Sequence, residues 1–142
     1  MDARPSATLR RRFDAPPARV YSAWTDPVKL GKWFGPARVV SAEAEADVRV
    51  GGRFRVRLTT NDGERHEVGG EYREIVPEEK LVFTWAWHST PERESLVTVR
   101  LKPDGDGTVL ILTHEQLFDE ASRDRHVMGW TGSFDKLEAF LA

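Results

Sequence analysis

The sequence contains no cysteine and no apolar run of membrane-spanning length. Without thiols the chain has no disulfide bond, cysteine nucleophile or thiolate metal site, and it suits a reducing compartment. A transmembrane helix requires about 20 consecutive apolar residues, and the N-terminal residues also lack the apolar segment of a signal peptide. We therefore expect a cytoplasmic protein that does not insert into a membrane.

An excess of charge of one sign is also lacking. The chain has 21 lysine and arginine residues against 23 aspartate and glutamate residues, which gives a net charge of −2 and a pI of about 6.1. Domains that bind nucleic acids through phosphate contacts usually carry a basic patch and a high pI. We therefore expect no nucleic-acid partner.

Residue patterns of common catalytic and metal sites are missing as well. No metal-ligand spacing such as His-x-x-x-His joins the four histidines, His66, His88, His114 and His126. The Gly51-Gly52 pair lacks the Lys-Ser/Thr ending of a phosphate loop, and no Gly-x-Ser-x-Gly motif is present. We therefore expect no metal and no cofactor, and we name no catalytic residue.

The chain is rich in large apolar residues. Its apolar content is 39%, with five tryptophans and seven phenylalanines, which is enough for a substantial core. A length of 142 residues suits one domain. We expect residues 1–142 to form a single domain with an ordered core over about residues 7–142.

Alternating apolar and polar residues predict an antiparallel sheet in the first 115 residues or so. The predicted strands cover residues 8–13, 38–46, 53–58, 67–75, 81–88, 95–101 and 108–114. The inward face of the strand at 81–88 stays open. Leu81, Phe83, Trp85 and Trp87 share one face, as core or as pocket lining, and His88 lies on the opposite face.

Two short helices are predicted after the first strand. Asp14-Ala-Pro-Pro17 opens the first, with Asp14 as its cap and the prolines in its first turn. Asp26-Pro27 ends that helix and begins a second one, which stops before Gly35-Pro36.

The segment 122–142 is predicted to be one long amphipathic helix. Its apolar residues recur at intervals of three and four, which places them on one stripe of a helix: Val127, Trp130, Phe134, Leu137 and Leu141. Such a stripe needs a large apolar surface to cover it, and the sheet is the available one. The chain is therefore predicted to be an α+β protein in which a curved sheet grips a long helix.

Small and polar residues lie beside the bulky ones on this helix. Gly129, Ser133 and His126 flank the Trp130–Phe134 stripe on a helical wheel. One interpretation is that they leave room for a ligand, since a purely structural helix would favour leucine or isoleucine there. The other is that Gly129 lets a strand or loop approach closely.

Seven short motifs also follow one another in an order typical of one family. They are Arg11-Arg-Phe-Asp-Ala-Pro-Pro17, Ala23-Trp-Thr-Asp-Pro27, Leu30-Gly-Lys-Trp-Phe-Gly-Pro36, Val50-Gly-Gly-Arg-Phe54, Gly70-Glu-Tyr-Arg-Glu-Ile75, Leu81-Val-Phe-Thr-Trp85 and Gly129-Trp130. Over about residues 7–142 the chain resembles the activator of heat-shock-protein-90 ATPase homologue 1-like family of the START-like (Bet v 1-like, polyketide cyclase-related) superfamily. The resemblance implies a helix-grip fold, in which a seven-stranded antiparallel sheet curves around the C-terminal helix and two short helices close one end. It also implies a cavity between sheet and helix, which in the wider superfamily holds lipids, sterols or polyketides.

Binding of a small, largely apolar ligand in that cavity is the first functional hypothesis. The ligand is a lipid, a polyketide or an aromatic compound, and the setting is stress response or resistance. The candidate ligand-binding residues are Trp33, Phe54, Val56, Tyr72, Trp85, His114, His126, Gly129, Trp130, Ser133 and Phe134.

Two alternatives remain open at this point. The first is a cyclase or hydrolase acting on a polyketide-like substrate, with His114, His126 or Glu74 as the acid or base. The second is an interaction module that modulates a chaperone ATPase, which makes a chaperone a further candidate partner. The chain is expected to be a monomer or a homodimer, since Val109 and Ile111 alternate to the outer face of the last strand.

Overall fold

The structure is a computed structural model that describes residues 3–142, so the first two residues of the expected domain lie outside the described part. The elements follow in the order β1 (Ala7–Phe13), α1 (Pro17–Thr25), α2 (Pro27–Trp33), β2 (Val39–Ala46), β3 (Arg53–Thr60), β4 (Arg65–Val76), β5 (Lys80–Trp87), β6 (Ser95–Asp104), β7 (Gly107–Glu115) and α3 (Glu120–Leu141). All seven strands join one antiparallel sheet in the order β1-β7-β6-β5-β4-β3-β2.

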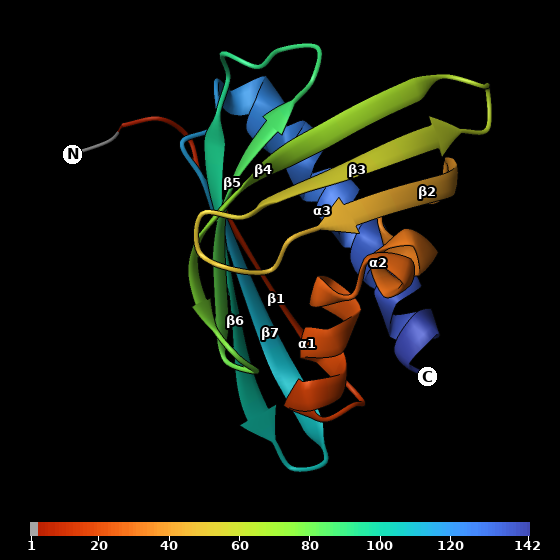
Figure 1. Ribbon diagram of the computed structural model, residues 1–142, viewed down its shortest axis with the longest axis vertical. Helices are drawn as coiled ribbons and strands as arrows, with labels where there is room; N and C mark the ends of the chain where they lie inside the picture. The colour runs from red at the N-terminus through yellow and green to blue at the C-terminus, as the bar shows by residue number, and fades with distance from the viewer. Residues whose placement is uncertain (1–2) are drawn as a thin grey trace.

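The sheet curves around α3, and α1 and α2 lie beside it (Figure 1). Helix α3 runs across the concave side of the sheet, and α2 contacts both α3 and strand β2. The predicted helix-grip architecture is therefore confirmed. All seven strands and three helices appear in the predicted order, with boundaries that shift by a few residues, most of all at the C-terminal end of β6, which runs to Asp104.

The aromatic face of strand β5 is the one that points inward, which answers the question that the sequence left open. Leu81, Phe83 and Trp85 are all less than 6% exposed and point into the core. The opposite face is half-buried except at Thr84, whose Oγ1 accepts the N–H of Glu71 at 2.8 Å. This bond lies next to the register shift between β4 and β5, so the threonine hydroxyl anchors an irregular part of the ladder.

The cap of α1 differs from the prediction. Its N-cap is Pro16, which makes no side-chain capping bond, and Pro17 occupies the first turn as predicted. Asp14 instead accepts a hydrogen bond from Arg12 Nη1 at 3.0 Å. The cap is the residue just before the first helical one, and Asp14 lies too far upstream to reach that position.

Helix α3 buries the predicted stripe against the sheet. Trp130, Phe134, Leu137 and Leu141 are at most 3% exposed, whereas Val127 is only half-buried. The helix begins at Glu120, slightly before the predicted start, because the Asp119 carboxylate accepts the N–H of Ser122 at 2.7 Å and caps the first turn.

Within residues 3–142, no helix combines the length and the apolar character that crossing a bilayer requires.

Candidate functional site

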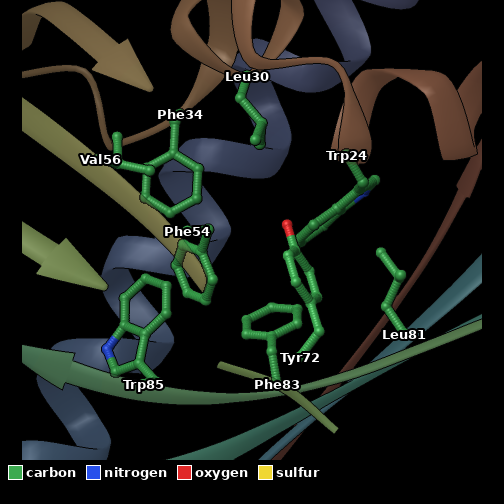
Figure 2. A pocket seen from close by; sticks show the side chains of 9 residues that line it. All are labelled: Trp24, Leu30, Phe34, Phe54, Val56, Tyr72, Leu81, Phe83 and Trp85. Carbon is green, nitrogen blue, oxygen red and sulfur yellow. The ribbon is translucent and has the colours of Figure 1, made fainter. Parts of the chain in front are cut away.

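A small cavity lies between the sheet and the pair of short helices. Its walls come from strands β3, β4 and β5, from α1 and α2, and from the residue that follows α2 (Figure 2). The lining side chains are aromatic or aliphatic: Trp24, Leu30, Phe34, Phe54, Val56, Tyr72, Leu81, Phe83 and Trp85. A space with this lining would favour apolar groups over water.

The cavity is almost filled by its own lining side chains in this structure. Its free volume is about 20 Å³, and a space of roughly 10–15 Å³ measured in this way is the minimum for one water molecule. Pockets that bind drug-sized ligands are usually about 300–1,000 Å³. A ligand larger than water therefore requires some of the lining side chains to move outward.

The proposed ligand-binding residues separate into two groups. Phe54, Val56, Tyr72 and Trp85 line the cavity. The other seven do not, namely Trp33, His114, His126, Gly129, Trp130, Ser133 and Phe134. No residue of α3 borders this cavity, which therefore lies on the α1–α2 side of the core and not, as expected, against the C-terminal helix.

Interlocked aromatic rings occupy the space between the sheet and α3. The ring of Trp130 packs 5.0 Å from Trp85, 5.9 Å from Phe34 and 5.8 Å from Trp24, measured between ring centroids. Phe134 adds an edge-to-face contact with Phe13 at 6.0 Å. Aromatic pairs at these distances stabilise a core beyond the burial of their area. The stripe on α3 therefore packs the core and leaves the free space elsewhere.

The His126 ring lies next to the indole groups of Trp85 and Trp87 on β5. The Nε1–H groups of Trp87 and Trp85 point at its Nε2 atom, at 3.1 and 3.3 Å. Because an indole only donates, Nε2 is the acceptor, and the proton of the neutral ring is on Nδ1. That proton is donated to the Ser122 carbonyl oxygen at 2.7 Å. Both ring nitrogens of His126 therefore have protein partners.

His114 has the opposite tautomer, for the same reason. Trp130 Nε1–H donates to its Nδ1 at 3.0 Å, which leaves the proton on Nε2. Nε2–H then donates to Ser95 Oγ at 2.8 Å, and the serine hydroxyl donates to the Trp85 carbonyl oxygen at 3.1 Å. In the Ser95–His114 pair the histidine is thus the donor and the serine oxygen the acceptor. This is the opposite of a catalytic dyad, in which histidine accepts the serine proton.

Burial keeps both histidines neutral. Desolvation, and secondarily the nearby His126, lowers the pKa of His114 to about 3. Desolvation also lowers the pKa of His126, with Arg125 acting in the same direction and the bond to Ser122 opposing it. The third candidate acid or base, Glu74, is about half exposed and pairs with Lys80 at 3.0 Å. These groups are fixed in structural hydrogen bonds or ion pairs, which favours a structural over a catalytic role.

Ser133 and Gly129 have roles that the helical wheel did not predict. Ser133 Oγ accepts the N–H of Gly35 at 3.0 Å and donates to the Gly129 carbonyl oxygen at 2.8 Å, which ties the segment after α2 to α3. A Cβ at Gly129 would meet no atom within 4 Å. The close approach occurs one turn later, where a Cβ at Gly132 would lie 2.8 Å from Pro36 Cβ.

Replacing Ser133 with alanine is expected to destabilise the fold by about 1–3 kcal/mol, because the buried N–H of Gly35 would lose its acceptor. Thr131→Ala is the matched control. Thr131 makes the same kind of bond to the carbonyl four residues earlier, at 2.7 Å to Val127, but it is exposed and holds no other segment. Urea unfolding should show a clear loss for S133A and a change within about 0.5 kcal/mol for T131A. Equal losses would contradict the tethering role.

Five lining residues were absent from the candidate set: Trp24, Leu30, Phe34, Leu81 and Phe83. Leu81 and Phe83 share a strand face with Trp85, so the alternation in β5 already contained them. The other three belong to the short helices and the residue after them. Nothing in their local spacing indicates that these helices, and not α3, close the cavity.

A wider groove of about 440 Å³ lies along strands β2–β5 and the segment that follows β5. Its rim is charged, and most of these charges have partners: Arg55 pairs with Glu45 at 2.8 Å, and Glu67 lies 3.3 Å from Arg57 and 3.9 Å from His88. Paired rim charges of this kind are ordinary features of a solvated sheet face.

Among the described residues no group of three or more histidine, aspartate or glutamate side chains could hold a metal ion.

Solved structures resemble this fold over almost its whole length. A protein from Chromobacterium violaceum is 30% identical, with a TM-score of 0.83 and coverage of 96% of this chain and 97% of its own. An AHSA1 protein from Silicibacter pomeroyi is also 30% identical, with a TM-score of 0.81 and coverage of 95% and 96%. CalU16 from Micromonospora echinospora is 29% identical, with a TM-score of 0.71 and coverage of 96% and 76%.

No functionally curated protein matches the sequence. Residues 14–142, however, match the family described as "Activator of Hsp90 ATPase homolog 1-like protein", which is most of the chain. This range contains α1, α2, α3 and six of the seven strands. The sheet that curls around α3 and the near-complete coverage of two relatives at 30% identity agree with that match. The chain therefore belongs to the family of activator of Hsp90 ATPase homologue 1-like proteins.

Proposed function

We propose that this protein binds a small, largely apolar molecule, such as a lipid, a polyketide or an aromatic compound, in the cavity between β3–β5 and the α1–α2 pair. The observation that carries the proposal is the convergence of nine aromatic and aliphatic side chains on one unfilled space. A binder of this kind would act in stress response or resistance by sequestering or sensing the compound.

Ligand entry requires the cavity to open on the side of the short helices. Leu30 in α2, Phe34 just after it and Trp24 in α1 form this wall, and none of them belongs to the sheet. Gly35, which follows Phe34, has a φ of +94°, a conformation open to glycine but rare for other residues. A glycine at this point permits the sharp turn of the backbone that follows Phe34.

The apolar surface that the ligand buries limits its affinity. Burying about 200 Å² of apolar ligand surface contributes about 5 kcal/mol at roughly 25 cal/mol per Å², before the costs of association and of opening the cavity. A free energy of about 5 kcal/mol corresponds to a dissociation constant of about 0.2 mM, so tighter binding requires a larger apolar contact or added hydrogen bonds. Binding is preferred to acid–base catalysis because His114 and His126 use their ring nitrogens in structural hydrogen bonds.

The test fills the cavity and measures binding of a neutral apolar dye, N-phenyl-1-naphthylamine. Val56 on β3 lines the cavity and is 1% exposed, so Val56→Phe should reduce the dye affinity at least tenfold. The control is Val40→Phe on β2, where the side chain is 65% exposed and outside the cavity. Dye fluorescence and quenching of the tryptophans report binding.

Two outcomes would overturn the proposal. One is a wild-type protein that does not bind the dye, and the other is equal binding by the wild type and V56F. If the dye does not bind and the ATPase rate of a chaperone responds to the protein, the interaction-module role takes its place.

A further inference from the structure

Four of the five tryptophans donate their indole proton to a protein acceptor. Trp33 donates to the Ala23 carbonyl at 2.9 Å. Trp85 and Trp87 donate to the half-buried His126, and Trp130 donates to the buried His114. Trp24 is the exception, because its Nε1 is buried and has no partner within the described residues. Its side chain, 3% exposed, lines the cavity.

The Tyr72 hydroxyl is the second polar group in the cavity that lacks a protein partner. Tyr72 is 3% exposed, and no residue of the described range 3–142 hydrogen-bonds to its hydroxyl. Figure 2 shows this hydroxyl pointing from β4 across the cavity toward α1 and α2, the elements that carry Trp24 and Leu30. Two hydrogen bonds at 2.9 Å join the Tyr72 backbone to Gly51 and Gly52, so the base of the side chain is held firmly.

Unsatisfied buried polar groups are uncommon in proteins and need a reason. Among the described residues two side-chain atoms are of this kind, Trp24 Nε1 and Arg55 Nε, and of the two only Trp24 belongs to a residue that lines the small cavity. The Tyr72 hydroxyl is not one of these fully buried atoms, but it also has no hydrogen-bond partner in the protein. Other buried polar side chains of the core, such as Thr108 and Ser95, have partners. A buried polar group without a hydrogen-bond partner costs free energy, and a ligand that supplies the partner recovers that cost when it binds.

The chemistry of the two groups restricts the ligand. An indole N–H only donates, and the phenol can donate. Burial, with smaller contributions from Tyr21 and Asp47, raises the pKa of Tyr72, so the phenol keeps its proton at neutral pH. No lysine, arginine, aspartate, glutamate or histidine side chain lines the cavity to balance a charge on the ligand.

We propose that Tyr72 and Trp24 select ligands that are neutral and carry a hydrogen-bond-accepting oxygen, such as a carbonyl, on an otherwise apolar skeleton. This inference rests on the proposed function and adds the class of ligand to it. Tyr72 provides the principal donor, because its hydroxyl reaches into the cavity, and Trp24 provides the second. A single water molecule between the two groups is the competing occupant, since the cavity has about the volume that one water needs.

The test compares two probes that differ only in this oxygen. Acetophenone carries a carbonyl group, and in α-methylstyrene a methylene group replaces the oxygen. We expect the wild type to bind acetophenone at least tenfold more tightly than α-methylstyrene. Tyr72→Phe should remove most of this preference and leave the affinity for α-methylstyrene unchanged, and Trp24→Phe should reduce the preference further. Trp87→Phe, which removes an indole N–H outside the cavity lining, is the control and should keep the preference.

Nuclear magnetic resonance gives an independent readout. The five indole N–H groups should give separate signals in a ¹H–¹⁵N spectrum, and the signal lost in W24F would be that of Trp24. Acetophenone should shift this signal strongly downfield, whereas α-methylstyrene should shift it only weakly. The Y72F variant should keep the wild-type melting temperature, because the hydroxyl that it loses makes no hydrogen bond to the described residues.

Each remaining outcome has a definite meaning. Equal affinity for the two probes would overturn the selection of an acceptor oxygen and leave apolar binding intact. A preference that survives in both Y72F and W24F would overturn the roles of these residues. If neither probe nor the naphthylamine dye binds, the proposed function fails together with this inference.

Discussion

Lowering the pH from 7 to 5 is expected to reduce the free energy of unfolding by about 2 kcal/mol through His114 alone. The folded state holds the pKa of His114 at about 3, against 6.5 for the free side chain, so the unfolded chain binds the proton first. The stabilising contribution is complete above pH 6.5 and declines as the pH falls from 6.5 toward 3. One pKa unit corresponds to about 1.4 kcal/mol, which gives the expected loss at pH 5. His126 acts in the same direction, because its pKa is also lowered.

Urea unfolding at the two pH values measures this loss, and the window stays above the usual pKa of exposed carboxylates. His114→Gln keeps a donor and an acceptor near Ser95 and Trp130 but cannot titrate, so the pH dependence should flatten. His88→Gln is the control, since the His88 side chain is 83% exposed and should leave the wild-type slope unchanged. A wild-type slope in H114Q would show that the pH dependence arises elsewhere.

Gly70→Ala is expected to destabilise the protein by more than about 3 kcal/mol, the largest effect of a single methyl group in this chain. A Cβ at Gly70 would clash with the carbonyl oxygen of Thr84 and lie 2.5 Å from its carbonyl carbon and 2.9 Å from its Oγ1. These atoms belong mainly to the backbone of the neighbouring strand, so the clash is relieved only by separating β4 from β5.

The matched control for this change is Gly129→Ala. Gly129 lies within α3, and a Cβ there would meet no atom within 4 Å. Alanine is the better helix former by about 1 kcal/mol, so G129A should leave stability unchanged or raise it slightly. Thermal and urea unfolding of both variants provide the comparison. Similar stabilities for G70A and G129A would contradict the close packing of β4 on β5.

The strands and helices could be predicted because their signals are local. In β3 the burial of Phe54, Val56 and Leu58 follows the alternation of the sequence directly. In α3 the three- and four-residue spacing from Trp130 to Leu141 produces the buried face. Where a local rule failed, a neighbouring residue was responsible. Pro16 took the N-cap position that Asp14 was expected to fill.

The candidate site could be predicted only in part. The residues on the aromatic face of the sheet, such as Tyr72 and Trp85, border the cavity because their strand parity points them inward. Which element covers them depends on how the helices pack. The wheel of α3 suggested free space near Gly129 and Ser133, but Ser133 binds Gly35, which is 98 residues away in the chain.

By itself, the sequence determined the α+β class, the order of the elements and the faces that they bury, since hydrophobic periodicity is a property of neighbouring residues. Tertiary structure decided where the core stays unfilled and how its histidines are protonated. The tautomer of His126 follows from Trp85 and Trp87, which lie 41 and 39 residues away, and that of His114 from Trp130, 16 residues away. Free volume and hydrogen-bond direction depend on side chains that are distant in the sequence and meet only in the folded protein. The local sequence pattern therefore does not predict them.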